Sequence, residues 1–168
     1  MKVLIIIDMQ NDFITGTLAN PEAQRIIPFI KEKIAEFREE NAKILYTHDT
    51  HGLNYLETLE GKKLPIKHCI AGTEGWQIVK ELRPAENEKT ICKSAFGFNN
   101  WRLYLDNRDE IYLCGTCTDI CVISNALAIK TACPESEVYV FKDGCAGLTK
   151  EKHEHALDVM ASCQIEVI

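Results

Sequence analysis

The stretch Val3-Leu4-Ile5-Ile6-Ile7 decides the fold, because five consecutive apolar residues run directly into a charged one, Asp8. Five further short runs rich in Ile, Val, Leu and Tyr follow along the chain. Strands that are apolar throughout are expected to be buried on both faces, as in a parallel sheet covered by helices. We therefore predict strands at residues 3–7, 44–47, 90–92, 111–114, 138–141 and 165–168.

Longer segments with helical spacing separate several of these strands, such as the apolar series between Ile26 and Phe37. The alternation predicts an α/β fold: a three-layer, six-stranded, mainly parallel sheet of the Rossmann-like kind with helices on both faces. A chain of 168 residues has the size of a single domain, here residues 1–168. The only long segment without periodicity runs from Asp49 to about Gly75, and loops of that length are often functional.

Composition and charge exclude several classes of partner. Nineteen Lys and Arg against 25 Asp and Glu give a net charge of −6, and no basic cluster is present, so nucleic acid and anionic membranes are poor candidates. The N-terminal apolar run is too short for a signal-peptide core or a membrane span, so we expect a cytoplasmic protein. In that compartment the eight cysteines are expected to be thiols, most of them buried.

Polar residues end four of the predicted strands, and ligands of an open parallel sheet bind beyond the carboxyl ends of its strands. The first strand ends at Asp8, and the second leads into the sequence HDTH at residues 48–51. The third ends at Cys92-Lys93, and the fourth continues into GTCTDIC at residues 115–121. An acid, a base and a thiol are therefore expected to converge on one edge of the sheet.

Cys121 is the candidate nucleophile. Thr118 is a predicted helix N-cap, which would place Cys121 in a first turn whose dipole favours the thiolate. A nearby Lys93 ammonium would lower the pKa of the thiol further, and Asp8 would accept its proton. Taken singly, a buried cysteine near a strand end is more often a packing residue, and an aspartate there can be a cap.

Asp49, His51 and His68 form a second candidate group. One carboxylate and two imidazoles suit Zn, Fe or Mn and leave positions open for water or substrate. On spacing alone, histidines of a polar loop are more often simply solvated.

Two other patterns carry less weight. Cys114-x-x-Cys117 could be a redox motif or half of a zinc knuckle, but Cys114 falls inside an apolar strand and no second such motif exists. His153 and His155 lie in a charged stretch that we interpret as the solvated first turn of the last helix, with the two rings on different faces.

Four separated segments match the motif pattern of one enzyme family. IIDMQNDF at residues 6–13 resembles the opening of the isochorismatase-like cysteine hydrolases, and CKSAFG at residues 92–97 resembles their lysine segment. GTCTDICV at residues 115–122 resembles the nucleophile segment, and DGCAGLT at residues 143–149 with His153 resembles the segment after the fifth strand. The four segments occur in the order seen in the family, and the resemblance covers nearly the whole chain. The resemblance implies catalytic roles for Asp8, Lys93 and Cys121.

The nicotinamidases of this family hold a metal with an Asp-x-His pair and a second His directly before a cysteine. Asp49, His51 and His68-Cys69 resemble that arrangement in order and separation. The resemblance thus implies a divalent metal, with zinc favoured and iron or manganese compatible. It also implies a metal-assisted amidohydrolase that converts nicotinamide to nicotinate and ammonia, a step of NAD salvage.

The implied chemistry passes through a thioester on Cys121, with Asp8 moving the protons. By resemblance, the backbone N–H groups of Cys117 and Cys121 stabilise the oxyanion, and the Thr116–Cys117 peptide bond is cis. Phe13 and Phe96 are candidates to flank a flat ring, although aromatic residues at such positions are almost as often part of a core.

Several alternatives stay open at this point. Relatives that hydrolyse carbamoyl or ureido groups keep the cysteine but lack the metal ligands, whereas isochorismatases proper lack the cysteine. A redox or metal-storage protein and a binding module without turnover both predict that Lys93 is dispensable. The expected partner is a small-molecule amide. A homo-oligomer is also considered, with Trp101 and Tyr104 as interface candidates or, equally, as residues packed on the sheet.

Overall fold

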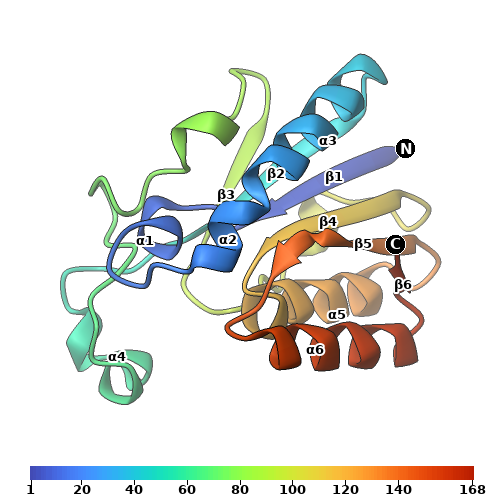
Figure 1. Cartoon of the computed structure of the whole chain (residues 1–168). Helices are drawn as coiled ribbons and strands as arrows, with labels where there is room; N and C mark the ends of the chain where they lie inside the picture. Colours follow the sequence, from blue (N-terminus) through green and yellow to red (C-terminus); the bar gives the residue numbers. More distant parts are fainter.

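The computed structural model describes residues 1–168 and contains one six-stranded sheet in the order β3-β2-β1-β4-β5-β6. Every neighbouring pair is parallel, which confirms the predicted architecture (Figure 1). The strand order reverses between β1 and β4, the kind of position at which open α/β sheets bind ligands. The strands are β1 Lys2–Ile7, β2 Lys43–Asp49, β3 Lys89–Lys93, β4 Glu110–Thr116, β5 Glu137–Ala146 and β6 Glu166–Val167.

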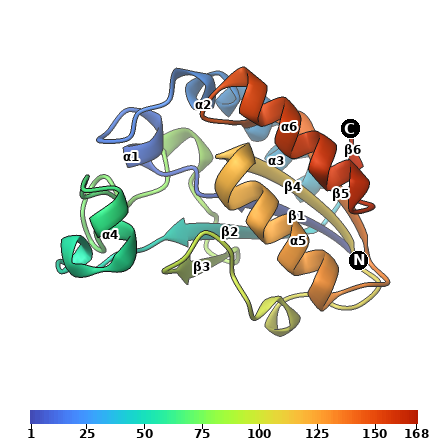
Figure 2. The same cartoon turned by 90° about the horizontal axis from the view of Figure 1, so that it is seen from below.

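Helices cover both faces of the sheet, so the three layers are also confirmed. α2 and α3 pack on one face, and α5 and α6 on the other, while α1 and α4 lie beyond the carboxyl ends of β1 and β2 (Figure 2). No helix combines the length and apolar character needed to cross a membrane. The α-helices are α1 Asn11–Ile14, α2 Pro21–Arg25, α3 Ile27–Glu39, α4 Leu59–Lys63, α5 Ile123–Ala132 and α6 Lys150–Ser162; shorter turns are η1 Tyr55–Glu57, η2 Lys80–Leu82, η3 Trp101–Leu103 and the π-helical η4 Thr118–Val122.

The deciding stretch of β1 lies at the centre of the sheet and feeds two cores. Val3, Ile5 and Ile7 pack toward α5, whereas Leu4 and Ile6 pack toward α3. All five side chains are fully buried, and each contributes about 1.5–3 kcal/mol relative to an exposed position. A strand with both faces covered must be apolar throughout, which is why this stretch does not alternate.

Gly115 allows β4 to approach β1 at the edge that carries the polar residues. Its φ is +128°, and a Cβ atom at this position would lie 2.1 Å from the carbonyl oxygen of Ile7. Only glycine fits such a contact and such a backbone conformation. The chain therefore enters the segment before Cys121 directly beside the end of β1.

Several predicted boundaries are wrong. β5 continues to Ala146, past the predicted end at residue 141, because Cys145 and Ala146 pair with Gly115 and Thr116 of β4 after a register shift. β6 has only two residues, and the segment after Asp49 contains η1 and α4.

Trp101 is fully buried in the core, so it is not an exposed interface residue.

Candidate active site

The carboxyl ends of β1, β3 and β4 bring an acid, a base and a thiol together, as predicted for this edge of the sheet. Lys93 Nζ lies 2.6 Å from Asp8 Oδ2 and 3.7 Å from Cys121 Sγ. All three residues are buried. We call Asp8, Lys93 and Cys121 the nucleophile cluster.

Asp8 is held by its neighbours on β2 and by an unusual backbone conformation. The Thr47 hydroxyl donates to Asp8 Oδ1 at 2.6 Å and accepts from the Asp8 amide at 3.1 Å. The φ of Asp8 is +50°, a left-handed conformation uncommon outside glycine, which turns the chain sharply after β1. Thr47 was not among the residues that the sequence pattern singled out.

The charges of the nucleophile cluster tune one another. Burial raises the pKa of Asp8, and the Lys93 ammonium opposes that rise. Burial alone would lower the pKa of Lys93, but the negative charges of Asp8 and Asp49 raise it, so the ammonium form persists. A carboxylate with a raised pKa beside a fixed cation is suited to accept and return a proton.

The expected activation of Cys121 needs correction. Burial and the Asp8 charge raise the pKa of its thiol, and Lys93 offsets this only in part. Cys117, not Thr118, occupies the N-cap position of η4 and provides no side-chain cap. The thiol is therefore protonated in the resting protein and needs a base to become a nucleophile.

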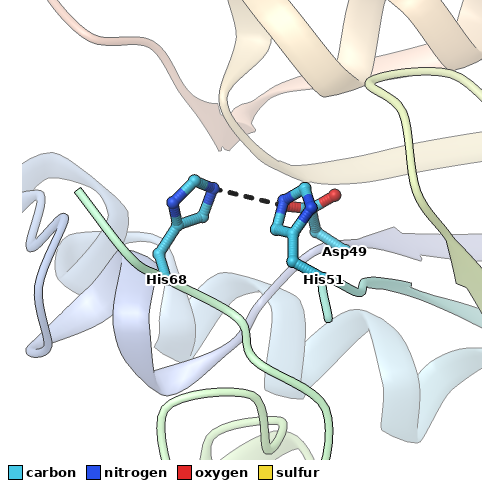
Figure 3. A group of neighbouring side chains, drawn as sticks. All are labelled: Asp49, His51 and His68. Carbon is cyan, nitrogen blue, oxygen red and sulfur yellow. Dashed lines mark hydrogen bonds and ion pairs between the residues drawn. The ribbon is translucent and has the colours of Figure 1, made fainter. Parts of the chain in front are cut away.

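Asp49, His51 and His68 form a second buried group, drawn in Figure 3. Asp49 Oδ2 lies 2.9 Å from His51 Nε2 and 3.6 Å from His68 Nε2. Potential ligand atoms of the three residues all lie within 4.8 Å of one another. We call them the metal cluster, because one carboxylate and two imidazoles at this spacing fit a divalent cation such as zinc.

Surrounding residues orient the metal cluster. His68 Nδ1 donates to the carbonyl oxygen of Ile66 at 2.8 Å, which leaves Nε2 facing Asp49. Gln10 fixes the end of β2 through the backbone of Asp49, accepting from its amide at 2.7 Å and donating to its carbonyl at 2.9 Å. Burial would raise the pKa of Asp49, but the hydrogen bonds from His51 and His68 lower it below the usual value. The carboxylate is therefore ionised.

Glu60 adds a second carboxylate that the sequence pattern did not single out. From α4 its Oε1 lies 3.7 Å from His51 Nε2 and 3.8 Å from His68 Nε2. It lies in the long segment without periodicity, where no pattern could place a side chain in space. Lys93 connects the two clusters, since its Nζ also lies 3.5 Å from Asp49 Oδ1.

A cavity of about 360 Å³ opens onto both clusters. Phe13 and Phe96 both line it, Phe96 being about half exposed at 48%. Its only charged lining residues are the acidic Asp49 and Glu60 and the ionisable His68, and no Lys or Arg lines it. The remaining lining residues are Leu18, Ala19, Leu64, Cys117, Ile120, Cys121 and Leu148.

The nucleophile turn, residues 116–121, is attached to the connection between β5 and α6. The Thr116–Cys117 peptide bond is cis, as the resemblance implies. Thr118 Oγ1 lies 2.8 Å from His153 Nδ1, so His153 is not the solvated residue that we expected. His155 is exposed, and Cys114 is fully buried, as predicted.

Two further residues near the site, His48 and Asn125, were assigned no role from the sequence. His48 packs against Trp76 with ring centroids 4.5 Å apart and ring planes tilted by 31°, and burial lowers the pKa of His48 to about 4. Asn125 donates to the carbonyl oxygens of Cys121 at 2.8 Å and Phe96 at 3.0 Å. Asn125 lies one helical turn after Cys121. This spacing points to a contact between the two residues only when the segment is already known to be helical.

Comparison with known proteins agrees with this architecture. Residues 2–168 match the model of the isochorismatase domain. An uncharacterised isochorismatase family protein of Bacillus subtilis is 31% identical over 176 residues, covering 96% of this chain and 94% of its own. The nicotinamidase/pyrazinamidase of Mycobacterium tuberculosis is 27% identical over 194 residues, covering 100% and 98% of the two chains. The crystal structure of pyrazinamidase of Pyrococcus horikoshii in complex with zinc shares 32% identity with a TM-score of 0.88, covering 99% and 98%. This chain belongs to the isochorismatase family.

Proposed function

We propose that this protein is a nicotinamidase-like amide hydrolase that works through a thioester on Cys121 with the help of a divalent metal. The observation that carries the proposal is that one cavity reaches both Cys121 and members of the metal cluster. Two of the relatives support it, since one is named a nicotinamidase/pyrazinamidase and the other a pyrazinamidase in complex with zinc.

In the first half-reaction Asp8 accepts the proton of the Cys121 thiol, and the thiolate attacks the carboxamide carbon. The C–N bond then breaks as Asp8 returns the proton to the nitrogen, which leaves as ammonia. Lys93 keeps Asp8 ionised at the start of this step, because its Nζ lies 2.6 Å from the carboxylate. The acyl group remains on Cys121 as a thioester.

In the second half-reaction Asp8 accepts a proton from water, whose oxygen attacks the thioester carbon. The C–S bond breaks, and the proton passes back to the Cys121 sulfur, so the protein returns to its starting state. The backbone N–H groups of Cys117 and Cys121 are proposed to stabilise both tetrahedral oxyanions. Loss of one such donor typically costs about 10²–10³ in rate.

Asp49, His51 and His68 would hold the metal, and Glu60 is close enough to join them. When bound, the metal would offer an open coordination position to a ring nitrogen and so fix the amide above Cys121. Zinc fits this mixed set of carboxylate and imidazole donors, which also accommodates iron or manganese.

The cavity lining favours a neutral ring amide over a carbamoyl amino acid. In the metal-free alternative a substrate carboxylate would meet Asp49 and Glu60, with no Lys or Arg in the lining to pair with it. Phe13 and Phe96 offer aromatic surface to a flat ring. Nicotinamide and pyrazinamide have the shape and neutrality that this lining accepts.

The test is ammonia release from nicotinamide, pyrazinamide, a carbamoyl amino acid and a ureido compound, before and after metal chelation. We expect rapid turnover of the two ring amides, loss of that turnover on chelation, and recovery when zinc is added. Preference for the carbamoyl or ureido compound, unaffected by chelation, would overturn the nicotinamidase assignment. Full activity of Cys121→Ser would overturn the thioester.

A further inference from the structure

Three polar contacts attach the nucleophile turn to residues 146–153, which comprise the end of β5, its connection to α6 and the first turn of α6. Thr116 Oγ1 donates to the Ala146 carbonyl at 3.1 Å, and Asp119 Oδ1 accepts from the Leu148 amide at 2.9 Å. Between them, Thr118 Oγ1 and His153 Nδ1 lie 2.8 Å apart. Of these three contacts, only the last joins two side chains, so it can be removed by a substitution outside the nucleophile turn.

We propose that His153 is a positioning residue, which holds the nucleophile turn through the Thr118 hydroxyl and so keeps Cys121 Sγ beside Lys93. The inference rests on the proposed role of Cys121 as nucleophile. His153 itself does not line the cavity, so it acts through Thr118 and not on the substrate.

The location of Thr118 makes this contact consequential. Thr118 is fully buried and is the first residue of η4, a π-helical turn that also contains Cys121. Such turns are rare and lack the regular hydrogen-bond ladder of an α-helix. Because no side chain caps η4, the side chains of Thr118 and Asp119 are what anchor that end of the turn. A buried hydroxyl without its partner would leave the turn free to shift.

The connection between β5 and α6 packs closely against both His153 and the nucleophile turn. A Cβ atom on Gly147 would lie 2.9 Å from His153 Cβ and 3.0 Å from Asp119 Oδ1. Glycine at this position thus lets the loop lie directly against both anchors. Burial lowers the pKa of His153 against the opposing charges of Glu154, Asp119 and Asp143, so the ring is neutral and Nδ1 can accept from Thr118.

The test compares four variants by kcat and KM on whichever amide the protein hydrolyses, and by the rate at which iodoacetamide alkylates Cys121 at pH 7. His153→Ala removes the contact. His153→Asn keeps a polar atom near the position of Nδ1, whereas His153→Gln places its amide near Nε2. His155→Ala is the matched control, an exposed histidine on the same helix.

We expect His153→Ala to lower kcat about 10- to 100-fold with KM changed less than about threefold. Alkylation of Cys121 should slow about tenfold as Sγ leaves Lys93, while the exposed Cys92 and Cys163 react unchanged. His153→Asn should recover most of both losses, His153→Gln should not, and His155→Ala should match the wild type.

The proposal is overturned if His153→Ala leaves kcat and Cys121 alkylation unchanged, or if Asn and Gln at this position behave alike. Cys121→Ala separates this failure from that of the proposed function. If Cys121→Ala abolishes hydrolysis while His153→Ala has no effect, the thioester stands and the positioning role falls. If Cys121→Ala remains active, the proposed function itself falls.

Discussion

The two clusters at the carboxyl edge differ in how their charges are balanced. In the nucleophile cluster the Lys93 ammonium lies 2.6 Å from Asp8, so an opposite charge is present within the protein itself. At the metal cluster the carboxylates of Asp49 and of the neighbouring Glu60 face two imidazoles. Lys93 reaches only Asp49 Oδ1, whereas the histidines face Oδ2. The first cluster is complete as the chain folds, whereas we propose that the second is completed by a cation.

This difference separates two kinds of dependence. Changes in the nucleophile cluster should affect both stability and chemistry, because its ion pair is buried in the protein. Changes in the metal cluster should affect the metal and the binding of substrate, while leaving the thiol in place. The following predictions test that separation, beginning with the largest expected effect.

Lys93→Met should produce the largest loss. The substitution leaves the Asp8 carboxylate buried without its cation, so Asp8 takes up a proton and can no longer act as the base. We expect kcat/KM to fall about 10²–10⁴-fold. Stability should fall by up to about 3–5 kcal/mol, less whatever protonation of Asp8 recovers, as measured by urea denaturation.

The control is Lys152→Met, which removes an exposed ammonium from α6. It should leave both kcat/KM and the stability in urea unchanged. If Lys93→Met retains at least half of the activity, Lys93 is dispensable and the role proposed for it in the nucleophile cluster falls.

His51→Ala should separate the clusters. It removes one of three metal-cluster ligands, and changing even an outer partner of a metal ligand typically costs about 10–100-fold in affinity. We expect zinc affinity to fall by at least about 100-fold, measured by competition with a chromogenic chelator. Alkylation of Cys121 should stay within about twofold of wild type, because the contact between Lys93 and Cys121 is intact.

Zinc should also raise the thermal midpoint of the wild type but not of His51→Ala, since a ligand bound only by the folded state stabilises it. Loss of Cys121 reactivity in this variant would show that the two clusters are not separable. An unchanged zinc affinity would remove His51 from the ligand set.

The contrast between the clusters also explains what the sequence could predict. Apolar runs gave the strands, and the rule that parallel strands end at one edge then grouped Asp8, Lys93 and Cys121. Residues whose role depends on contacts between elements were missed. Thr47 reaches Asp8 from a neighbouring strand, and Glu60 reaches the histidines from a segment without periodicity.

The errors have the same origin. His153 looked like a surface residue because its neighbours in sequence are charged, yet the turn that it contacts lies 35 residues earlier. The predicted thiolate at Cys121 followed from local charges, whereas burial, which depends on the whole fold, dominates the pKa. Periodicity reports which face of an element is apolar, not which side chain of another element meets it.

Glu60→Gln should have a smaller effect confined to the metal cluster. The change removes a negative charge 3.7 and 3.8 Å from the two histidine nitrogens but keeps the shape of the side chain. We expect zinc affinity to fall about tenfold and kcat at saturating zinc to remain within about twofold. Glu57→Gln, an exposed residue of η1, is the matched control. An equal loss in both variants would mean that overall charge, not the location of Glu60, is responsible.

Thr47→Val should have the smallest effect, visible mainly as a shift in pH dependence. The Thr47 hydroxyl stabilises the ionised form of Asp8 through a 2.6 Å hydrogen bond, so its loss raises the Asp8 pKa further above the ordinary value. Because the base must be ionised, the acid limb of kcat/KM should move to higher pH, by about one unit if the bond contributes about 1.5 kcal/mol. Well above that limb, activity should stay within about threefold of wild type. Thr131→Val, whose hydroxyl donates to Leu127 on α5 far from the site, should leave the limb in place. A limb that stays fixed in Thr47→Val, or moves to lower pH, would mean that Asp8 is not the group whose ionisation controls the rate.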